Sequence, residues 1–447
     1  MNARQHDSKK RQLASALRLQ SEGQVRLGKN TSNLFRDREK QGGDSPRLDV
    51  RGFTDVLRVN PGEQWVEVEG MTTYADLVDV TLAQGVLPCV VPQLKTITIG
   101  GAIAGVGIES SSFRYGLSHE TVLEMDVLTG TGEIVTCTPD NQHADLFFGL
   151  PNSYGTLGYV LKLRARTVSA KPYVQLEHRR HHDPVDLFND LQAHSTDADF
   201  LDGTVFAEDE LYLTVGRFVE DAPWTSDYTF ENIYYRSIRE NTIDYLTVAD
   251  YIWRWDTDWF WCSRNLYAQQ PWLRRLLGRK RLNSETYTRV MRWNSRWQLT
   301  RRLSRLRGLH PESVIQDVDI PVDRAPEFLD FFHKEIGINP IWICPMKSYR
   351  DDVCFPLFPT NPGTLYINFG FWDVVNSRQS RPAGYLNRKI EQKVQELGGI
   401  KSLYSDSFFE PDEFWAIYSR PVYDELKARY DPDNKFGDLY QKTVLRQ

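Results

Sequence analysis

The chain of 447 residues contains 40% hydrophobic and 26% charged residues and has a formal net charge of −6. This length and composition suit a globular protein with two domains and large cores. The acidic balance argues against nucleic acid as a general partner. The five scattered cysteines include no CxxC pair, so they read as buried thiols in a reducing compartment, and neither a disulfide framework nor a zinc site is indicated.

Residues 1–24 are polar and lack the apolar core of a signal peptide, so we expect a mobile or helical leader. No apolar run of about eighteen residues occurs in the chain, which argues against a transmembrane helix. The default location is therefore the cytoplasm, and peripheral contact with the inner face of the membrane stays open.

The segment after the leader alternates between turns and strands. Residues 28–33 are a small, polar, turn-forming run after a short strand. Residues 50–70 alternate in the manner of strands around an Asn-Pro-Gly turn. Apolar side chains then recur from Tyr74 to Leu82 at the spacing of a short amphipathic helix, which Gly85 ends.

Residues 90–116 form a glycine-rich stretch, VVPQLKTITIGGAIAGVGIESSSFRYG. Its glycines let a backbone approach another body closely, and backbone N–H groups among small residues bind phosphate well. The spacing matches neither a P-loop nor G-x-G-x-x-G. By itself the stretch is compatible with a plain glycine-rich turn or with a cofactor cradle.

Downstream, residues 120–137 predict two strands joined by a Gly-Thr-Gly turn, and residues 173–240 contain further alternating stretches. Residues 313–322 and 364–372 also read as strands. A helix is expected within residues 386–399, ending at the glycine pair.

Residues 272–307 are strongly basic, with Glu285 as their only acidic residue. The basic positions are Arg274, Arg275, Arg279, Lys280, Arg281, Arg289, Arg292, Arg296, Arg301, Arg302, Arg305 and Arg307. Trp, Leu and Met are interleaved with them. The pattern fits a solvated helix face, and it fits equally well a surface for anionic lipid or for a phosphate-bearing ligand.

Five motifs occur in order within about eighty residues: P-x-x-x-x-T-I-G-G-A, Y-G, D-x-L-x-G-x-G-E-I, D-L-F and G-T-L-G-hydrophobic. This order resembles the FAD domain of the vanillyl-alcohol oxidase type, also called the PCMH type. The resemblance implies an α+β fold. An FAD domain of two subdomains would cover residues 25–168, an α+β substrate or cap domain 169–425, and a C-terminal segment returning to the FAD domain 426–447.

By the same resemblance, the loop at residues 29–33 wraps the FAD pyrophosphate. The implied cofactor-binding residues are Lys29, Asn30, Thr31, Ser32, Asn33, Thr98, Ile99, Gly100, Gly101, Gly105, Gly107, Ser110, Ser111, Gly155, Thr156, Gly158 and Val160. Some members of the family attach flavin through a His in this loop. The loop here has none, so we expect non-covalent FAD.

The chain is also similar to the delta(24)-sterol reductase branch, through ITIGGAIAGVGIESSSFRYGL, INPIWICPMKS and DSFFEPDEFWAIY. Bacterial reductases of methylene-branched fatty acyl chains look like the same branch. The resemblance implies that FAD takes a hydride from NADPH and passes it to an isolated C=C bond of a lipid. An FAD-dependent oxidase of an alcohol or sugar, with dioxygen as acceptor, is the alternative.

The cap segment departs from the sterol reductases, which have His and Arg where this chain has Trp253, Trp255 and Asp256. The substrate is therefore open between a sterol side chain and a methylene-branched fatty acyl chain. The sequence does not predict the oligomeric state.

Reduction of an isolated alkene requires an acid, because no carbonyl draws electron density from the double bond. Asp256 and Asp258 lie among tryptophans, where a carboxyl would stay protonated and indole faces would stabilise a cation. Tyr115 and His119 are the other catalytic candidates, with Tyr404 to be tested next to them. Alternatively, the tryptophans are core residues, and the two carboxylates pair with Arg254 and Arg264.

Overall fold

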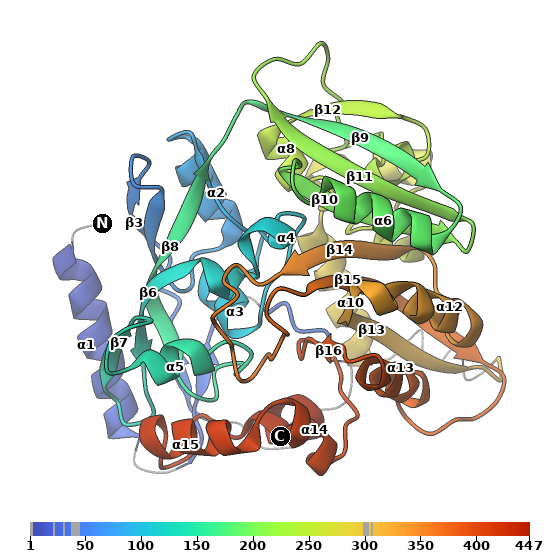
Figure 1. Ribbon diagram of the computed structural model, residues 1–447. Helices are drawn as coiled ribbons and strands as arrows, with labels where there is room; N and C mark the ends of the chain where they lie inside the picture. The colour runs from blue at the N-terminus through green and yellow to red at the C-terminus, as the bar shows by residue number, and fades with distance from the viewer. Residues whose placement is uncertain (1–2, 21–22, 30–31, 37–44, 298–303, 305–306) are drawn as a thin grey trace.

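The computed structural model describes residues 3–20, 23–29, 32–36, 45–297, 304 and 307–447 (Figure 1). It contains two large antiparallel sheets, with helices packed against them, and a short parallel pair of strands. The predicted α+β fold class is confirmed.

The first sheet is six-stranded, with the order β3-β4-β8-β6-β7 and with β5 paired to β8. From Leu161 onward the central strand β8 alternates between buried and half-buried residues, as expected for a strand with one face packed on the core. The predicted hairpins at residues 50–70 and 120–137 are β3–β4 and β6–β7. The strands are β3 (Val56–Asn60), β4 (Trp65–Glu69), β5 (Val86–Pro88), β6 (Val122–Leu128), β7 (Ile134–Cys137) and β8 (Tyr159–Ser169).

Short helices on this sheet begin at defined caps. Thr73 caps α2 and Thr98 caps α3, each accepting a hydrogen bond from a backbone N–H in the first turn. The helix predicted from Tyr74 to Leu82 is α2. The helices on this sheet are α2 (Tyr74–Leu82), α3 (Ile99–Ala104) and α5 (Ala144–Gly149), whereas α4 (Ser112–Tyr115) packs against β14 (Ile341–Lys347) of the second sheet.

The second sheet is eight-stranded, with the order β12-β9-β11-β10-β14-β15-β13-β16. Its strands are β9 (Tyr173–His181), β10 (Phe200–Ala207), β11 (Glu210–Val219), β12 (Ile243–Thr247), β13 (His310–Pro321), β14 (Ile341–Lys347), β15 (Leu365–Ser377) and β16 (Ile400–Lys401). Helices α6 (Pro184–His194), α12 (Ala325–Glu335) and α13 (Tyr385–Glu396) cover one face and share a core with it (Figure 1).

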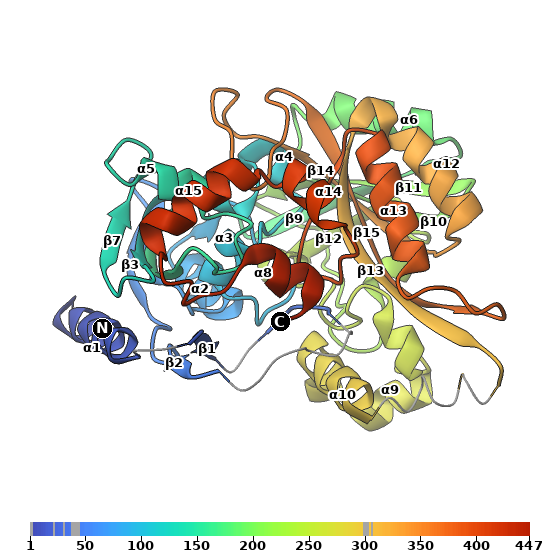
Figure 2. The same cartoon turned by 90° about the horizontal axis from the view of Figure 1, so that it is seen from below.

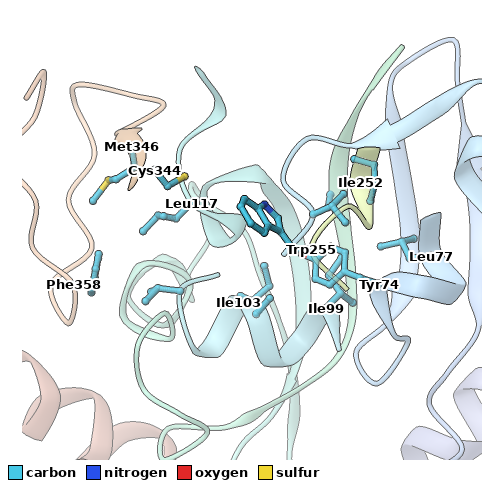
Figure 3. Close-up of a cluster of buried hydrophobic side chains, with 14 of the residues drawn as sticks. Tyr74, Leu77, Ile99, Ile103, Leu117, Ile252, Trp255, Cys344, Met346 and Phe358 are labelled. Atoms are coloured by element: carbon cyan, nitrogen blue, oxygen red, sulfur yellow. The ribbon is translucent and has the colours of Figure 1, made fainter. Parts of the chain in front are cut away.

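The other face of the second sheet shares one apolar core with the first half of the chain (Figure 3). Ile99 and Ile103 of α3 belong to this cluster, as do Cys344 and Met346 of β14. Trp255 lies between the two sets, on the connection that includes α8 (Val248–Ile252). Because both halves bury side chains in the same core, their facing surfaces are held together.

Segments from both ends of the chain pack on the first sheet. Helix α1 (Ala3–Leu19) is fastened by His6 and Lys9, which bind the buried carboxylate of Glu69. Helices α14 (Pro411–Ile417) and α15 (Arg420–Tyr430) run along the bottom of Figure 1, where α15 packs against α5. The proposed domain boundaries at residues 24, 168 and 425 stay predictions.

Within the described residues, no helix is long and apolar enough to span a membrane.

Replacing the buried Asp431 with Ala should lower the free energy of unfolding by about 3 kcal/mol. Its carboxylate pairs with Lys427 at 2.6 Å and accepts the backbone N–H groups of Lys435 and Phe436. Loss of the carboxylate leaves two amide donors without their acceptor and removes the counterion of Lys427, whose Nζ keeps its hydrogen bonds to Thr156 O and Gly437 O. Chemical denaturation measures the change. The exposed Asp433→Ala is the control, and equal stability of the two variants would contradict this role for Asp431.

Candidate functional site

A cavity of about 760 Å³ lies between the two halves of the chain. The first half contributes β1 (Arg26–Gly28), the β4–α2 turn, α3 and the start of β8. The second half contributes residues of β13, β14 and β15 and the segment before α9 (Pro271–Leu277). Residues 436–447 complete the wall. A volume of this size is typical of a site for a cofactor or a drug-sized ligand.

Backbone groups approach one another closely at the floor of the cavity. The Gly100 N–H donates to Gly70 O at 2.9 Å, and a Cβ on Gly100 would lie 2.7 Å from the same oxygen. A Cβ on Gly70 would lie 2.0 Å from Val160 O. Since real Cβ atoms do not come so close, only glycine fits at these two positions. The floor is therefore backbone without side chains.

Eleven of the predicted cofactor-binding residues line this cavity. They are Lys29, Ser32, Asn33, Thr98, Gly100, Gly101, Gly105, Gly107, Gly155, Gly158 and Val160. Asn30 and Thr31 lie outside the described residues. The glycine-rich stretch and the polar run near residue 30, which are distant in the sequence, thus meet at one site.

Four predicted cofactor-binding residues lie outside the cavity lining, and each has a structural role. Ile99 is buried in the shared core. Ser110 Oγ shares a 3.0 Å hydrogen bond with the Tyr251 hydroxyl, and Ser111 Oγ donates to Cys89 O. Thr156 Oγ1 donates to Ser153 O within its own turn. The hydroxyls of Ser110, Ser111 and Thr156 are thus engaged inside the protein, and a role of these four residues in cofactor binding stays a prediction.

Lys442 is the centre of a cationic part of the cavity wall. Its pKa is lowered to about 7 by burial and by four neighbouring cations. These neighbours are Arg36, Lys29, Lys427 and Arg26. Repulsion among these cations favours an anionic ligand, because a bound phosphate would offset it.

Aromatic side chains form another part of the wall. The ring of Phe260 lies 4.4 Å from that of Trp372, and the ring of Phe35 lies 5.5 Å from that of Trp259. Trp372 Nε1 donates a 3.0 Å hydrogen bond to the Tyr404 hydroxyl. These side chains come from residues 35, 259–260, 372 and 404, so the fold assembles the wall from four separate segments.

Asp317 of β13 contributes a carboxyl group to this aromatic wall. Burial raises its pKa to about 8, Asp319 adds to the rise, and a hydrogen bond with Tyr404 opposes it. Asp317 Oδ1 is buried and has no hydrogen-bond partner among the described residues. Gly370 faces Asp317 across the ladder, and a Cβ there would lie 2.8 Å from this oxygen. The site therefore holds a protonated carboxyl at neutral pH.

Asp256 and Asp258, the predicted acids, do not line the cavity. Arg274 holds Asp258 through two hydrogen bonds of 2.7 and 2.8 Å. Asp256 accepts from Ser284 Oγ and lies 3.2 Å from Lys95 Nζ. Both carboxylates are fixed by cations or hydroxyls, which makes them structural. The alternative prediction, that the two carboxylates form ion pairs, agrees better with the structure. Their partners are Lys95 and Arg274, however, and not Arg254 and Arg264.

Tyr115 and His119 are also outside the cavity lining. The half-buried Tyr115 lies on α4, next to the guanidinium of Arg114. His119 is buried, with its ring 4.3 Å from that of Phe355, and burial lowers its pKa to about 3. A neutral imidazole packed in this way cannot serve as an acid at neutral pH.

The sequence analysis did not select Asp317, Trp372 or Lys442. One signal for Asp317 was present, since Asp317 and Asp319 alternate with apolar residues in the strand VIQDVDIP. Acidic residues on one face of such a strand are unusual, and they point to a buried polar site. Trp372 and Lys442 carried no comparable signal.

The residues that line the cavity fit FAD. The side-chain-free floor allows close approach of a planar ring or a diphosphate. The cations around Lys442 suit a pyrophosphate, and the aromatic wall suits an apolar ring system. No His or Cys occurs among the described residues that line the cavity.

Residues 9–138 match the protein family described as FAD binding domain. The chain is 26% identical over 427 residues to the delta(24)-sterol reductase of Homo sapiens, covering 87% of this chain and 76% of the relative. The Arabidopsis thaliana delta(24)-sterol reductase is 23% identical over 450 residues, covering 89% and 76%. A delta(24)-sterol reductase homolog of Caenorhabditis elegans is 24% identical over 422 residues, covering 87% and 77%.

These comparisons confirm the FAD-binding, delta(24)-sterol reductase-like resemblance and the PCMH-type fold class. The matched domain starts at residue 9, inside the segment predicted as a leader, and ends before β8. It includes Gly70, Gly100 and Lys29 of the cavity lining, but neither Val160 of β8 nor Trp372 of β15. The family match therefore covers part of the cavity.

Gly101→Val should strongly reduce flavin retention during purification. Gly101 is exposed at the cavity wall, and Thr98 Oγ1 is the protein atom nearest to an added Cβ, at 2.8 Å. A branched side chain would narrow the space for a cofactor and disturb the cap of α3. The ratio of flavin to protein absorbance measures the loss.

The control for this substitution is Gly62→Val, in the β3–β4 turn, where a Cβ would make ordinary contact at 3.7 Å. This control should keep its flavin. A fully loaded Gly101→Val protein would remove the glycine stretch from the cofactor site.

Proposed function

We propose that this protein is an FAD-dependent oxidoreductase that reduces an isolated C=C bond of a lipid, with NADPH as the source of hydride. The observation that carries the proposal is the buried carboxyl of Asp317, with its pKa near 8, in an aromatic wall of the candidate FAD cavity. The names of the relatives, delta(24)-sterol reductases, support the reaction class.

An isolated alkene is a poor hydride acceptor, so proton transfer must lead or accompany the reduction. When bound, FAD supplies the hydride-transfer chemistry. The protein must supply the proton and surroundings that tolerate positive charge. A proton added to the less substituted carbon of a branched alkene leaves a tertiary cation, which is the easiest cation to stabilise.

Asp317 is the proposed proton donor. Its carboxyl holds a proton at neutral pH because burial penalises the carboxylate. Tyr404 hydrogen-bonds to Asp317 and accepts a hydrogen bond from Trp372 Nε1, so this series of hydrogen bonds fixes the carboxyl in place. The acid gives one proton to the alkene, and the hydride completes the saturated product. The carboxylate must then regain one proton from solvent before the next turnover.

The aromatic wall suits a developing cation. Desolvated indole faces attract positive charge by ~1–2 kcal/mol each. Trp259 and Trp372 line the same cavity as Asp317. Phe260 follows Trp259 in the chain, and its ring lies 4.4 Å from that of Trp372. The wall also keeps water away, which protects both the cation and the protonated carboxyl.

Two lipid substrates are compatible with this chemistry, a sterol with a side-chain alkene and a methylene-branched fatty acyl chain. The names of the relatives favour the sterol. Asp256 does not line the cavity, so its difference from the sterol reductases is weaker evidence against a sterol substrate. Anaerobic turnover with each lipid, in the presence of NADPH or NADH, distinguishes both the substrates and the donors.

The oxidase alternative has less support. It relies on the broader flavoprotein fold, whereas relatives that cover most of the chain carry the name of a reductase. Rapid reoxidation of the reduced flavin by dioxygen, together with a covalent flavin, would support the oxidase.

Acid precipitation should release all of the flavin into the supernatant. The basis is that the described cavity lining contains no His or Cys to bond with the ring. Absorbance of the supernatant and of the redissolved pellet measures the partition. Flavin that stays in the pellet would contradict non-covalent binding and revive the oxidase.

Asp317→Asn should slow alkene reduction by ~10²-fold or more, the scale expected for loss of a general acid. Flavin content and flavin reduction by NADPH should be unchanged, because neither step uses this proton. In the unmodified protein, alkene reduction should be constant below pH 8 and fall above it, as Asp317 loses its proton. Stopped-flow absorbance and product analysis measure the two half-reactions separately.

The matched control is Asp373→Asn on β15, where Asp373 pairs with Arg264 and does not line the cavity. It should behave like the unmodified protein. Full turnover by Asp317→Asn would exclude Asp317 as the donor, and Tyr404→Phe would be the next variant.

A further inference from the structure

Helices α9 and α10 (Ser284–Trp297) expose large apolar side chains on the surface of the molecule. Trp272 is 67% exposed, Leu276 is 72% exposed and Trp293 is 57% exposed. Tyr267 and Val290 lie close by in the sequence and are also exposed. Five of the thirteen exposed large hydrophobic side chains of the described chain thus fall within residues 267–293. Such a concentration marks an interaction surface.

The same surface carries positive charge, although the whole chain is acidic. Its exposed charged side chains are Arg275, Arg279, Lys280, Arg281, Glu285 and Arg289. Three of these arginines form ion pairs with exposed acidic residues. Because solvent screens such pairs, they are weak. Lys280 and Arg281 lie between the two helices and form no ion pair with the residues that the structure describes.

The α9–α10 surface is rigidly connected to the cavity wall. Arg274 of α9 holds Asp258 through two hydrogen bonds, and the Tyr287 hydroxyl of α10 donates to Thr257 O at 2.8 Å. The next two residues, Trp259 and Phe260, line the cavity. Figure 2 shows α9 and α10 projecting from the body of the molecule, so their outer faces are accessible.

We propose that the outer faces of α9 and α10, residues 267–293, dock on an anionic lipid bilayer. Tryptophan beside basic side chains is the combination that sits at a membrane interface, with indoles at the headgroup level and cations among anionic headgroups. Nucleic acid would also attract the cations. It would not explain the exposed Leu276 and Val290, which have no base-reading or phosphate-binding role.

Docking in this way brings the cavity wall at Trp259 and Phe260 close to the membrane from which a lipid substrate would come. The inference does not depend on the reaction, because it concerns binding to vesicles without turnover. It goes beyond the proposed function by naming the surface that meets the bilayer.

The test is sedimentation of the full chain with vesicles of phosphatidylcholine alone or with added phosphatidylglycerol. Binding should require the anionic lipid and should weaken as salt rises, since exposed charges are screened over ~8 Å at physiological ionic strength. The double variant Trp272→Ala, Trp293→Ala should lose about tenfold or more of the binding. The control is Trp224→Ala, at a tryptophan outside residues 267–293 that is 52% exposed and packs on Tyr245.

Charge is tested separately. Lys280→Gln with Arg281→Gln should weaken binding about fivefold for each side chain. The control removes two other exposed cations, Arg180 and Arg378, and should bind normally. Thermal melting checks that each variant is folded.

Three outcomes would overturn the proposal. These are absence of binding to anionic vesicles, equal loss with the Trp224→Ala control, and binding to a single-stranded oligonucleotide that the Trp272→Ala, Trp293→Ala variant retains while vesicle binding stays undetected. Loss confined to the two α9–α10 variants would support the bilayer as the partner, whatever the enzyme's substrate proves to be.

Discussion

Close packing of three backbone segments is the constraint on which the cavity depends. Gly70, at the end of β4, lies between Val160 of β8 and Gly100 at the start of α3. A methyl group at either glycine would meet a carbonyl oxygen at less than van der Waals distance, so the segments would have to separate. The floor would then lose its shape, and the cations and aromatic rings placed around it would no longer face a common space.

The sequence predicted the parts of the structure that depend on local pattern. Alternation and turn residues located the two hairpins, and the glycine-rich motifs located the floor. The aromatic wall was beyond such reasoning, because Phe35, Trp259, Trp372 and Tyr404 are brought together only by the pairing of distant strands and loops. Burial of Asp317, and with it the shift in its pKa, likewise depends on what the fold places around it.

Asp256 and Asp258 show what composition cannot predict, because neither carboxylate lines the cavity. Carboxylates among tryptophans look like acids in an apolar pocket. Here Asp258 binds Arg274 of α9 and Asp256 binds Ser284 at the start of α10, so both helices are fastened to the segment that precedes them. Trp259 and Phe260 have φ values of 44° and 59°, in the left-handed region that costs non-glycine residues about 1–3 kcal/mol each. The fastened helices hold this unfavourable backbone in place, so the acidic pair supports the cavity wall indirectly.

The cavity wall joins residues 24–29 and 32–35 with residues 436–447, which are separated by about 400 positions in the sequence. At typical rates of synthesis, the second segment leaves the ribosome roughly 20 to 80 s after the first. Lys442 and the cations that surround it therefore cannot form a complete phosphate-binding wall on a nascent chain. Cofactor loading should therefore be a late, post-translational event.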